Sequence, residues 1–294
     1  MTTNTNAGFR GLVCCGIAAT AIFSAHAMAG DAQFINVFDK SKMKETVPGA
    51  MMAELVGHNI SVETFFIKGG SAPLSKGKYH YHPEEHVWFQ FTGESHYEIK
   101  FNEQKTLRYD AGLGEMMHIP ADQMHRGGHG EEDHFMAMVS TPPRASTVAE
   151  QALDKRCYIA APTECTQAPP RIPTRDLYDK FVFADLKATR VKKGIHVRQG
   201  KLGEGAGLGQ EALMFRKNAK STDVISANKP PAEEVAIVYQ GRVKVTGCGE
   251  TRELVRGDVF YCPGALTYAG LGKEDSQVLR VFAPANPDFF IAKP

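Results

Sequence analysis

Four histidines in the first half of the sequence have the types and spacing of a metal site. His80 and His82 are two residues apart, His86 follows closely, and His125 lies much further along the chain. Residues two apart on a strand point to the same face, so His80 and His82 can converge on one ion. His86 shares their parity, and His125 must arrive from another strand. Since neutral imidazole is the commonest metal ligand, the pattern predicts one ion bound by all four.

Several residues near these histidines are candidates for supporting roles. Three are weak catalytic candidates that would orient a substrate or carry a proton: Glu84, Glu85 and Gln90. Three more are candidates for lining the pocket or supporting the ligands from behind, although packed barrel core is the preferred interpretation: His118, Trp88 and Met116. We expect the remaining nearby histidines to be solvated loop or strand positions: His96, His129 and His134.

Short strands must position these residues. From about residue 34 to residue 139 the chain has short runs rich in aromatic and β-branched residues, such as VETFFI, HVWFQF and HFMAMV, separated by turn residues. This spacing predicts an all-β sandwich or barrel. In residues 142–175 the sequence STVAEQALDKRCY predicts a short helix, and the prolines of APPRIP exclude a regular element. Strand-like runs resume at KFVFADL.

The two halves of the chain repeat one pattern. Residues 85–94 (EHVWFQFTGE) and residues 233–242 (EEVAIVYQGR) each give a strand, a turn glycine and the start of another strand. A Gly-acid pair follows in each half, with a proline six residues after its glycine. We infer a duplicated domain. The predicted boundaries are a signal peptide at 1–29, a first barrel at 30–142, a linker at 143–176 and a second barrel at 177–294.

These motifs resemble those of the cupin superfamily. The first cupin motif contains Gly, His-x-His, usually Glu, and Gly; here it falls on His80, His82, His86 in the Glu place, and Gly93. The second contains Gly, Pro-x-Gly and His; here it falls on Gly114, Pro120, Asp122 in the Gly place, and His125. The resemblance implies an all-β fold of two tandem cupin barrels, which are jelly rolls or double-stranded β-helices, with a short helical, Pro-rich linker.

His86 is an informative departure from the family pattern. The usual ligand is a glutamate, and Glu85 is one residue out of register, so it should point to the opposite face. A site made only of imidazoles would leave the ion its full positive charge. Such a site favours Fe(II), Cu(II), Zn(II), Ni(II) or Co(II) over Mg(II) and Ca(II). It would attract an anionic chelate such as an enolate, phenolate or carboxylate.

The second half lacks most of these ligands. Counting back from Glu234 puts Asn228 and Pro230 where the paired histidines should be, and Tyr268 falls where the last one should be. Only the carboxylate remains. We therefore expect no metal in the second barrel, whose role would be packing or dimerisation, with a second ligand pocket as the alternative.

The preferred functional hypothesis is a metal-dependent dioxygenase acting on a small anionic, enolisable or phenolic substrate. This activity is implied by the resemblance, and it requires an open coordination position. One alternative is an oxygen-independent isomerase, decarboxylase or lyase. Another is a non-enzymatic exported protein that binds a metal or a small acid. Oxygen consumption by the metal-loaded protein separates the first two, and ligand capture without a product indicates the third.

The first thirty residues predict export. Arg10 precedes an apolar run from Gly11 to about Ala25, and the small residues of Ala27-Met28-Ala29 precede Gly30. This is typical of a secretory signal peptide, and the run is shorter than the ~20 residues of a spanning helix. We expect a periplasmic or secreted protein without stable membrane insertion, and an uncleaved membrane anchor is the alternative. A net charge of +1 favours no nucleic acid. The remaining partners are a small-molecule substrate and, from the resemblance alone, a second copy.

Four cysteines would remain after cleavage: Cys157, Cys165, Cys248 and Cys262. An even number in an oxidising compartment indicates disulfides. A Cys157–Cys165 bridge is the first interpretation, but four cysteines allow three pairings and the sequence does not choose between them. Four separate buried thiols are the alternative, and a zinc site is disfavoured because no pair has close ligand spacing.

Overall fold

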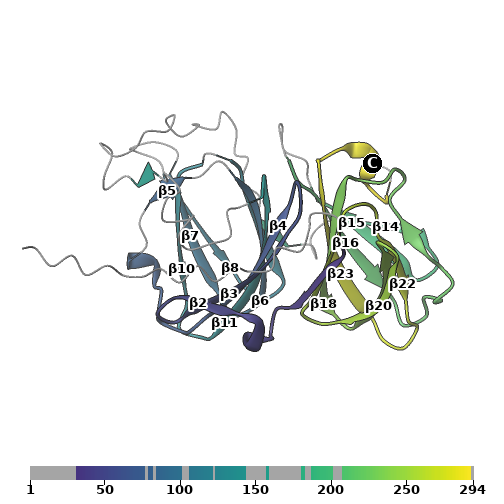
Figure 1. Ribbon diagram of the computed structural model, residues 1–294, viewed down its shortest axis with the longest axis horizontal. Coiled ribbons are helices and arrows are strands. Elements are labelled where there is room, and N and C mark those ends of the chain that lie inside the picture. Colours follow the sequence, from purple (N-terminus) through teal and green to yellow (C-terminus); the bar gives the residue numbers. More distant parts are fainter. Residues whose placement is uncertain are drawn as a thin grey trace, which may run out of the picture.

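The chain forms two antiparallel β-barrels that lie side by side (Figure 1). The computed structural model describes residues 31–76, 79–81, 84–100, 106–121, 123–143, 157–158, 180–182, 187–200 and 207–292. The expected signal peptide and nearly all of the expected linker lie outside these ranges. Within them, no helix has the length and apolar character needed to cross a bilayer. The described part consists mainly of strands, which confirms the all-β prediction.

The first barrel contains two sheets. The larger has seven strands in the order β13 (Lys180–Val182), β9 (Glu115–Ile119), β6 (Glu85–Thr92), β11 (His134–Thr141), β4 (Ser61–Ile67), β3 (Ala50–Val56) and β2 (Lys44–Val47). The smaller has five, in the order β12 (Cys157–Tyr158), β5 (His80–Tyr81), β10 (His125–His129), β7 (Ser95–Lys100) and β8 (Thr106–Ala111). Two short 3-10 helices accompany them, η1 (Lys40–Lys42) and η2 (Leu74–Lys76).

The second barrel repeats this arrangement. Its larger sheet has the order β1 (Gln33–Asn36), β21 (Asp258–Cys262), β18 (Glu233–Gln240), β23 (Ser276–Ala283), β16 (Gly209–Phe215), β15 (Ile195–Gln199) and β14 (Ala188–Lys192). Its smaller sheet has the order β17 (Ile225–Ser226), β22 (Thr267–Gly270), β19 (Arg242–Gly247) and β20 (Glu250–Val255). A 3-10 helix, η5 (Pro287–Phe289), follows β23. The strand order thus reproduces the duplication inferred from the sequence.

Each barrel takes one edge strand from the other half of the sequence. The N-terminal strand β1, purple in Figure 1, pairs with β21 of the second barrel, with Phe34 opposite Phe260. In return, β13 pairs with β9 of the first barrel, with residue 181 opposite Met116. The boundaries predicted at 30 and 177 therefore separate both strands from the sheets to which they are hydrogen-bonded. A strand of only three or four residues has no sequence pattern that shows with which sheet it pairs.

Alternation along β6 divides its side chains between two environments. Val87 and Phe89 belong to a buried apolar cluster that also contains Val235 of the second barrel. Trp88 points the other way and packs against Tyr97 of the smaller sheet, with ring centroids 5.7 Å apart. Odd-numbered residues of β6 therefore form the interface between the barrels, and even-numbered residues line the interior of the first barrel.

One disulfide is present in the described part of the chain. Cys248 and Cys262 are bonded, with their Cα atoms 5.9 Å apart. This bond corrects the alternative of four separate thiols, and it excludes the two pairings that join either residue to Cys157 or Cys165. Cys165 and the side chain of Cys157 lie outside the described residues, so the Cys157–Cys165 bridge stays a prediction.

Candidate metal centre

Three strands of the first barrel carry the histidines predicted to bind metal. His80 lies on β5, His86 on β6 and His125 on β10. In the ladder between β5 and β10, residue 80 is the direct partner of residue 125. This pairing joins the two motifs that the sequence shows far apart. His82 and the side chain of His80 lie outside the described residues.

The hydrogen bonds of His125 determine its tautomer. The side chain is 2% exposed, and its Nδ1 lies 2.8 Å from the backbone oxygen of Gln123. A carbonyl oxygen only accepts, so Nδ1 carries the proton and the lone pair of the neutral ring is on Nε2. A metal-binding histidine typically has this kind of support, with its other ring nitrogen bonded to a carbonyl or carboxylate.

His86 is fully buried on the interior face of the larger sheet. Its Nδ1 lies 2.8 Å from the hydroxyl oxygen of Ser140, which is its ladder partner on β11. On β9 its partner is Ile119, while the partner of His125 on β7 is Ile99. These two isoleucines pack in one buried cluster, so His86 and His125 line the same interior from the two sheets.

Glu85 occupies the opposite face of β6, as the alternation predicts. Its Oε1 accepts a hydrogen bond from the backbone N–H of Leu208 at 3.2 Å, and its Oε2 accepts one from Gly207 at 2.5 Å. His118 Nε2 lies 2.8 Å from Oε1. Met116 belongs to the apolar cluster between the barrels. His118 and Met116 are therefore packed against the second barrel, which was the preferred interpretation of both residues, and they do not take the pocket or supporting position that was the other possibility.

The other predicted residues divide between the interior and its rim. Trp88 lines the interior, stacked on Phe65 with ring centroids 5.8 Å apart. Gln90 has the same parity and is fully buried, and its amide oxygen lies 3.3 Å from Ser95 Oγ. Glu84 is buried at the residue before β6.

Glu63 is an interior carboxylate that the sequence reasoning missed. It lies on β4 with the parity of Phe65, is 0% exposed, and has Met138 and Glu54 as its ladder partners. A carboxylate inside an otherwise apolar run, SVETFFI, was the available signal. Buried glutamates are rare unless they are paired or functional, which makes Glu63 a candidate group of the site.

Oxalate decarboxylases are among the solved structures to which this chain is similar. The enzyme from Bacillus subtilis at pH 4.6 superposes with a TM-score of 0.60 at 13% identity, covering 91% of this chain and 78% of that chain. The enzyme from Lactobacillus farciminis in complex with formate gives a TM-score of 0.59 at 14% identity, covering 86% of each chain. This chain has the bicupin fold. No protein-family model and no curated protein matches its sequence.

The second barrel of the bicupin contains an ion-pair network where the first carries its histidines. Glu234, the counterpart of His86 on β18, accepts hydrogen bonds from Arg280 Nε at 2.6 Å and from the Tyr268 hydroxyl at 2.6 Å. Arg280 also donates to Glu211 at 2.7 Å, and all four side chains are buried. Burial alone would lower the pKa of Arg280, but the carboxylates of Glu234 and Glu211 raise it above its usual range.

Of two histidines that we expected to be solvated, His134 is fully buried in the first barrel and His129 beside it is half-buried. His134 is 0% exposed, and its ring centroid lies 4.7 Å from that of His129. Burial, with a smaller effect of neighbouring histidines, lowers the pKa of His129 to about 3 and that of His134 to about 4. For His134 the solvated interpretation was wrong. His96 is half-buried on the outer face, with Nδ1 2.6 Å from Asp110.

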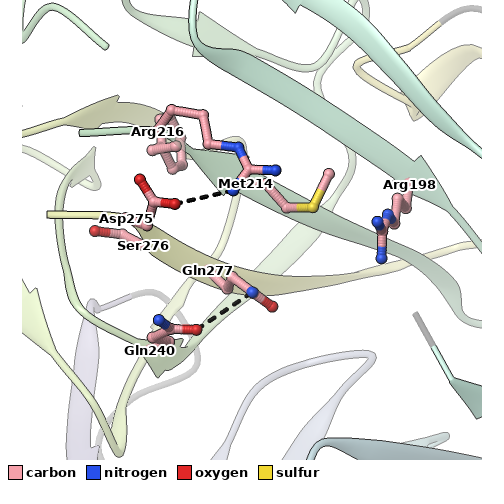
Figure 2. Close-up of a pocket in the computed structure, with 8 residues that line it drawn as sticks. Arg198, Met214, Arg216, Gln240, Asp275, Ser276 and Gln277 are labelled. Atoms are coloured by element: carbon pink, nitrogen blue, oxygen red, sulfur yellow. Dashed lines mark hydrogen bonds and ion pairs between the residues drawn. The ribbon is translucent and has the colours of Figure 1, made fainter. Parts of the chain in front are cut away.

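A cavity of about 310 Å³ lies on the second barrel, away from the histidines (Figure 2). Arg216 and Asp275 pair across its wall at 2.9 Å, and Gln277 donates to Gln240 at 3.3 Å. Arg198 lies on the other side of the cavity in this view. Four of the polar groups in the wall thus bind one another in pairs.

Proposed function

We propose that the first barrel is a metal-dependent enzyme that decarboxylates a small carboxylic acid without consuming oxygen. The observation that carries the proposal is the pair of buried imidazoles, His86 and His125, which face one interior and are each supported at Nδ1. The likeness to oxalate decarboxylases favours this alternative over the dioxygenase that the sequence motifs first suggested. The low identity means that the likeness supports only the fold directly.

The residues present fit a divalent transition metal. His80, His82, His86 and His125 would hold it through neutral nitrogens, which suit Fe, Cu, Zn or Ni. When bound, the ion would supply Lewis-acid polarisation of the substrate's carboxylate oxygens. The bonds from His125 to Gln123 and from His86 to Ser140 fix the two rings in place before a ligand arrives.

The remaining interior groups would orient the substrate and manage its proton. Trp88 and Phe65 form an aromatic wall beside the histidines, which excludes water. When a dicarboxylic acid loses CO₂, the carbon left behind must take up one proton. Glu63 is our candidate for the group that holds this proton, because it is a carboxylate on the same interior face.

The test is to load untagged protein with each of these metals and supply oxalate and other small acids. We expect release of CO₂ with no oxygen uptake. Stoichiometric oxygen uptake would overturn the proposal in favour of a dioxygenase, and tight binding without a product would indicate a binding protein.

Metal content provides a separate measurement. His125→Ala should remove most of the metal from the first barrel, whereas His86→Glu should retain it, because glutamate is the usual cupin ligand at this position. Tyr268→Phe in the second barrel is the matched control and should leave the metal content unchanged. An unchanged content in His125→Ala would refute the assignment of this ligand.

Export and dimerisation remain predictions of the sequence. Cleavage near Gly30 would be seen as a mature N-terminus by mass spectrometry of protein recovered from the periplasm or medium. A second copy of the chain would be seen as a doubled mass in solution.

A further inference from the structure

A second group of polar side chains lies inside the first barrel, at the far end of β10 from His125. We call Gln90, Ser95, His129 and His134 the distal cluster. Ser95 and His129 are ladder partners on β7 and β10. His129 follows His125 by four residues of extended strand, which corresponds to about 13 Å. The distal cluster is therefore separate from the candidate metal centre.

The distal cluster converges on one point. Ser95 Oγ lies 3.2 Å from His129 Nδ1, 3.0 Å from His134 Nε2 and 3.3 Å from Gln90 Oε1. In a tetrahedral zinc shell with bonds of about 2.0–2.1 Å, neighbouring ligand atoms are roughly 3.3 Å apart. The three distances from Ser95 Oγ to the two nitrogens and to Gln90 Oε1 are thus close to those between neighbouring ligand atoms of a metal shell.

Hydrogen bonding alone leaves the distal cluster incompletely satisfied. Gln90 and His134 are both 0% exposed, and Gln90 Nε2 has no hydrogen-bond partner among the described residues. Ser95 Oγ donates to Gln90 Oε1, and its hydroxyl oxygen can accept from the two imidazoles. Native proteins carry few buried polar atoms without a partner, so Gln90 Nε2 marks this position as unusual.

The second barrel shows that the fold does not require polar groups here. The counterparts of Gln90 and Ser95 are Val238 and Val243, which belong to its apolar core. Gly270 and Ser276 take the places of His129 and His134. The same strands therefore close the second barrel with mainly apolar residues, so the polar residues of the distal cluster need another reason.

We propose that the distal cluster binds one transition-metal cation through the imidazoles of His129 and His134, with Gln90 and Ser95 supplying oxygen atoms. The donor set of two nitrogens and two neutral oxygens suits Zn(II), Co(II), Ni(II) or Cu(II) better than Mg(II) or Ca(II). This site is additional to the centre at His86 and His125, and it does not depend on the proposed decarboxylase activity.

Two further features fit this site. Both imidazoles have a lowered pKa, so they stay neutral and able to bind metal well below pH 7. Glu94, His96 and Asp110 lie at the surface beside them, with one potential ligand atom from each within 4.8 Å of the others. His96 is close enough to influence both buried rings. These surface groups would attract a cation to this end of the barrel.

The experiment counts metal ions in untagged, full-length protein after chelator treatment and reloading with Co(II). We expect two equivalents in the wild type, one with the visible absorption of a tetrahedral N₂O₂ site. His134→Ser, which introduces the residue that the second barrel has at this place, should remove that ion only. His125→Ala should remove the other ion only. Loss of one equivalent in each single variant therefore distinguishes the two sites.

A gain-of-binding variant keeps the test informative if His134→Ser folds poorly. Gln90→Glu replaces a neutral oxygen ligand with a carboxylate and should tighten Co(II) binding at the distal cluster at least tenfold. The double variant Gln90→Val with Ser95→Val, which copies the second barrel, should weaken it by a similar factor. A Co(II) stoichiometry and affinity unchanged by His134→Ser and by Gln90→Glu would overturn the proposal.

Discussion

Glu63, His86 and Met138 lie on the interior face of the first barrel, and Glu211, Glu234 and Arg280 take the same three places in the second. Each barrel therefore has a buried carboxylate at this place, on β4 in the first and on β16 in the second, and in the second it pairs with the guanidinium of Arg280. The second barrel neutralises its interior with its own cation. The first has a neutral thioether at that place and imidazoles where the second has a carboxylate, which suits an interior that receives a cation from outside.

Replacing Arg280 with the residue of the first barrel should have the largest effect on stability. Arg280→Met leaves Glu211 and Glu234 buried without their cation, and breaking a buried ion pair in this way costs about 3–5 kcal/mol. We expect a loss of that size in the free energy of unfolding measured with urea. Met138→Leu, the matched substitution in the first barrel, should cost less than about 1.5 kcal/mol. Equal losses in the two variants would contradict the comparison.

Much of this architecture could be predicted from the sequence because it follows local patterns. Short runs of aromatic and β-branched residues predicted the barrels, and the repeated turn glycines predicted the duplication. The alternation of side chains along a strand predicted that Glu85 lies on the face opposite His86. These predictions depend only on residues close together in the chain. The pairing of residue 80 with His125 required the family motifs as well.

The missed features depend on contacts between distant segments. The exchange of β1 and β13 is determined by the packing of whole barrels, which no short run encodes. The distal cluster was missed because His129 and His134 were considered as isolated loop or strand histidines, without regard to parity. A better rule would have been available: in a buried strand, a polar residue with inward parity indicates a site. That rule also finds Glu63 and Arg280.

The stability of the first barrel should depend on pH through the distal cluster. His129 and His134 have pKa values of about 3 and about 4 in the folded protein, below the ordinary value of about 6.5. At pH values between the folded pKa and about 6.5, these histidines bind protons in the unfolded chain but not in the folded chain. The free energy of unfolding therefore falls as the pH falls through this range. At pH 5 the loss is about 2 kcal/mol for each histidine.

Urea unfolding of the metal-free protein at pH 7.5 and pH 5 measures this dependence. The second barrel has Ser276 at the position of His134, so His134→Ser makes the two barrels alike there. The variant should lose about 2 kcal/mol less than the wild type on acidification. An identical pH dependence in both proteins would mean that His134 is not held neutral by burial.

The smallest expected effect concerns the symmetric contacts that hold the barrels together. Glu233 accepts hydrogen bonds from the backbone N–H groups of His58 and Asn59 at 2.7 Å and of Ile60 at 2.9 Å. Glu85 accepts from two backbone N–H groups in the matching loop of the second barrel. Glu233 of the second barrel thus binds the residues just before β4 of the first barrel. Glu85 of the first barrel binds the residues just before β16 of the second.

Substituting each glutamate with glutamine should reveal whether the two contacts are equivalent. Glutamine has the size of glutamate, but it has one acceptor oxygen, and its NH₂ group would face a backbone N–H group that now bonds to the second oxygen. We therefore expect losses of about 1–2 kcal/mol in the free energy of unfolding. The loss should be larger for Glu233→Gln, because three backbone donors lose a charged acceptor there and only two do at Glu85. The opposite order would mean that the bond between Glu85 and His118 contributes more than the additional backbone donor, and the face of β9 that carries His118 would then be the stronger half of the interface.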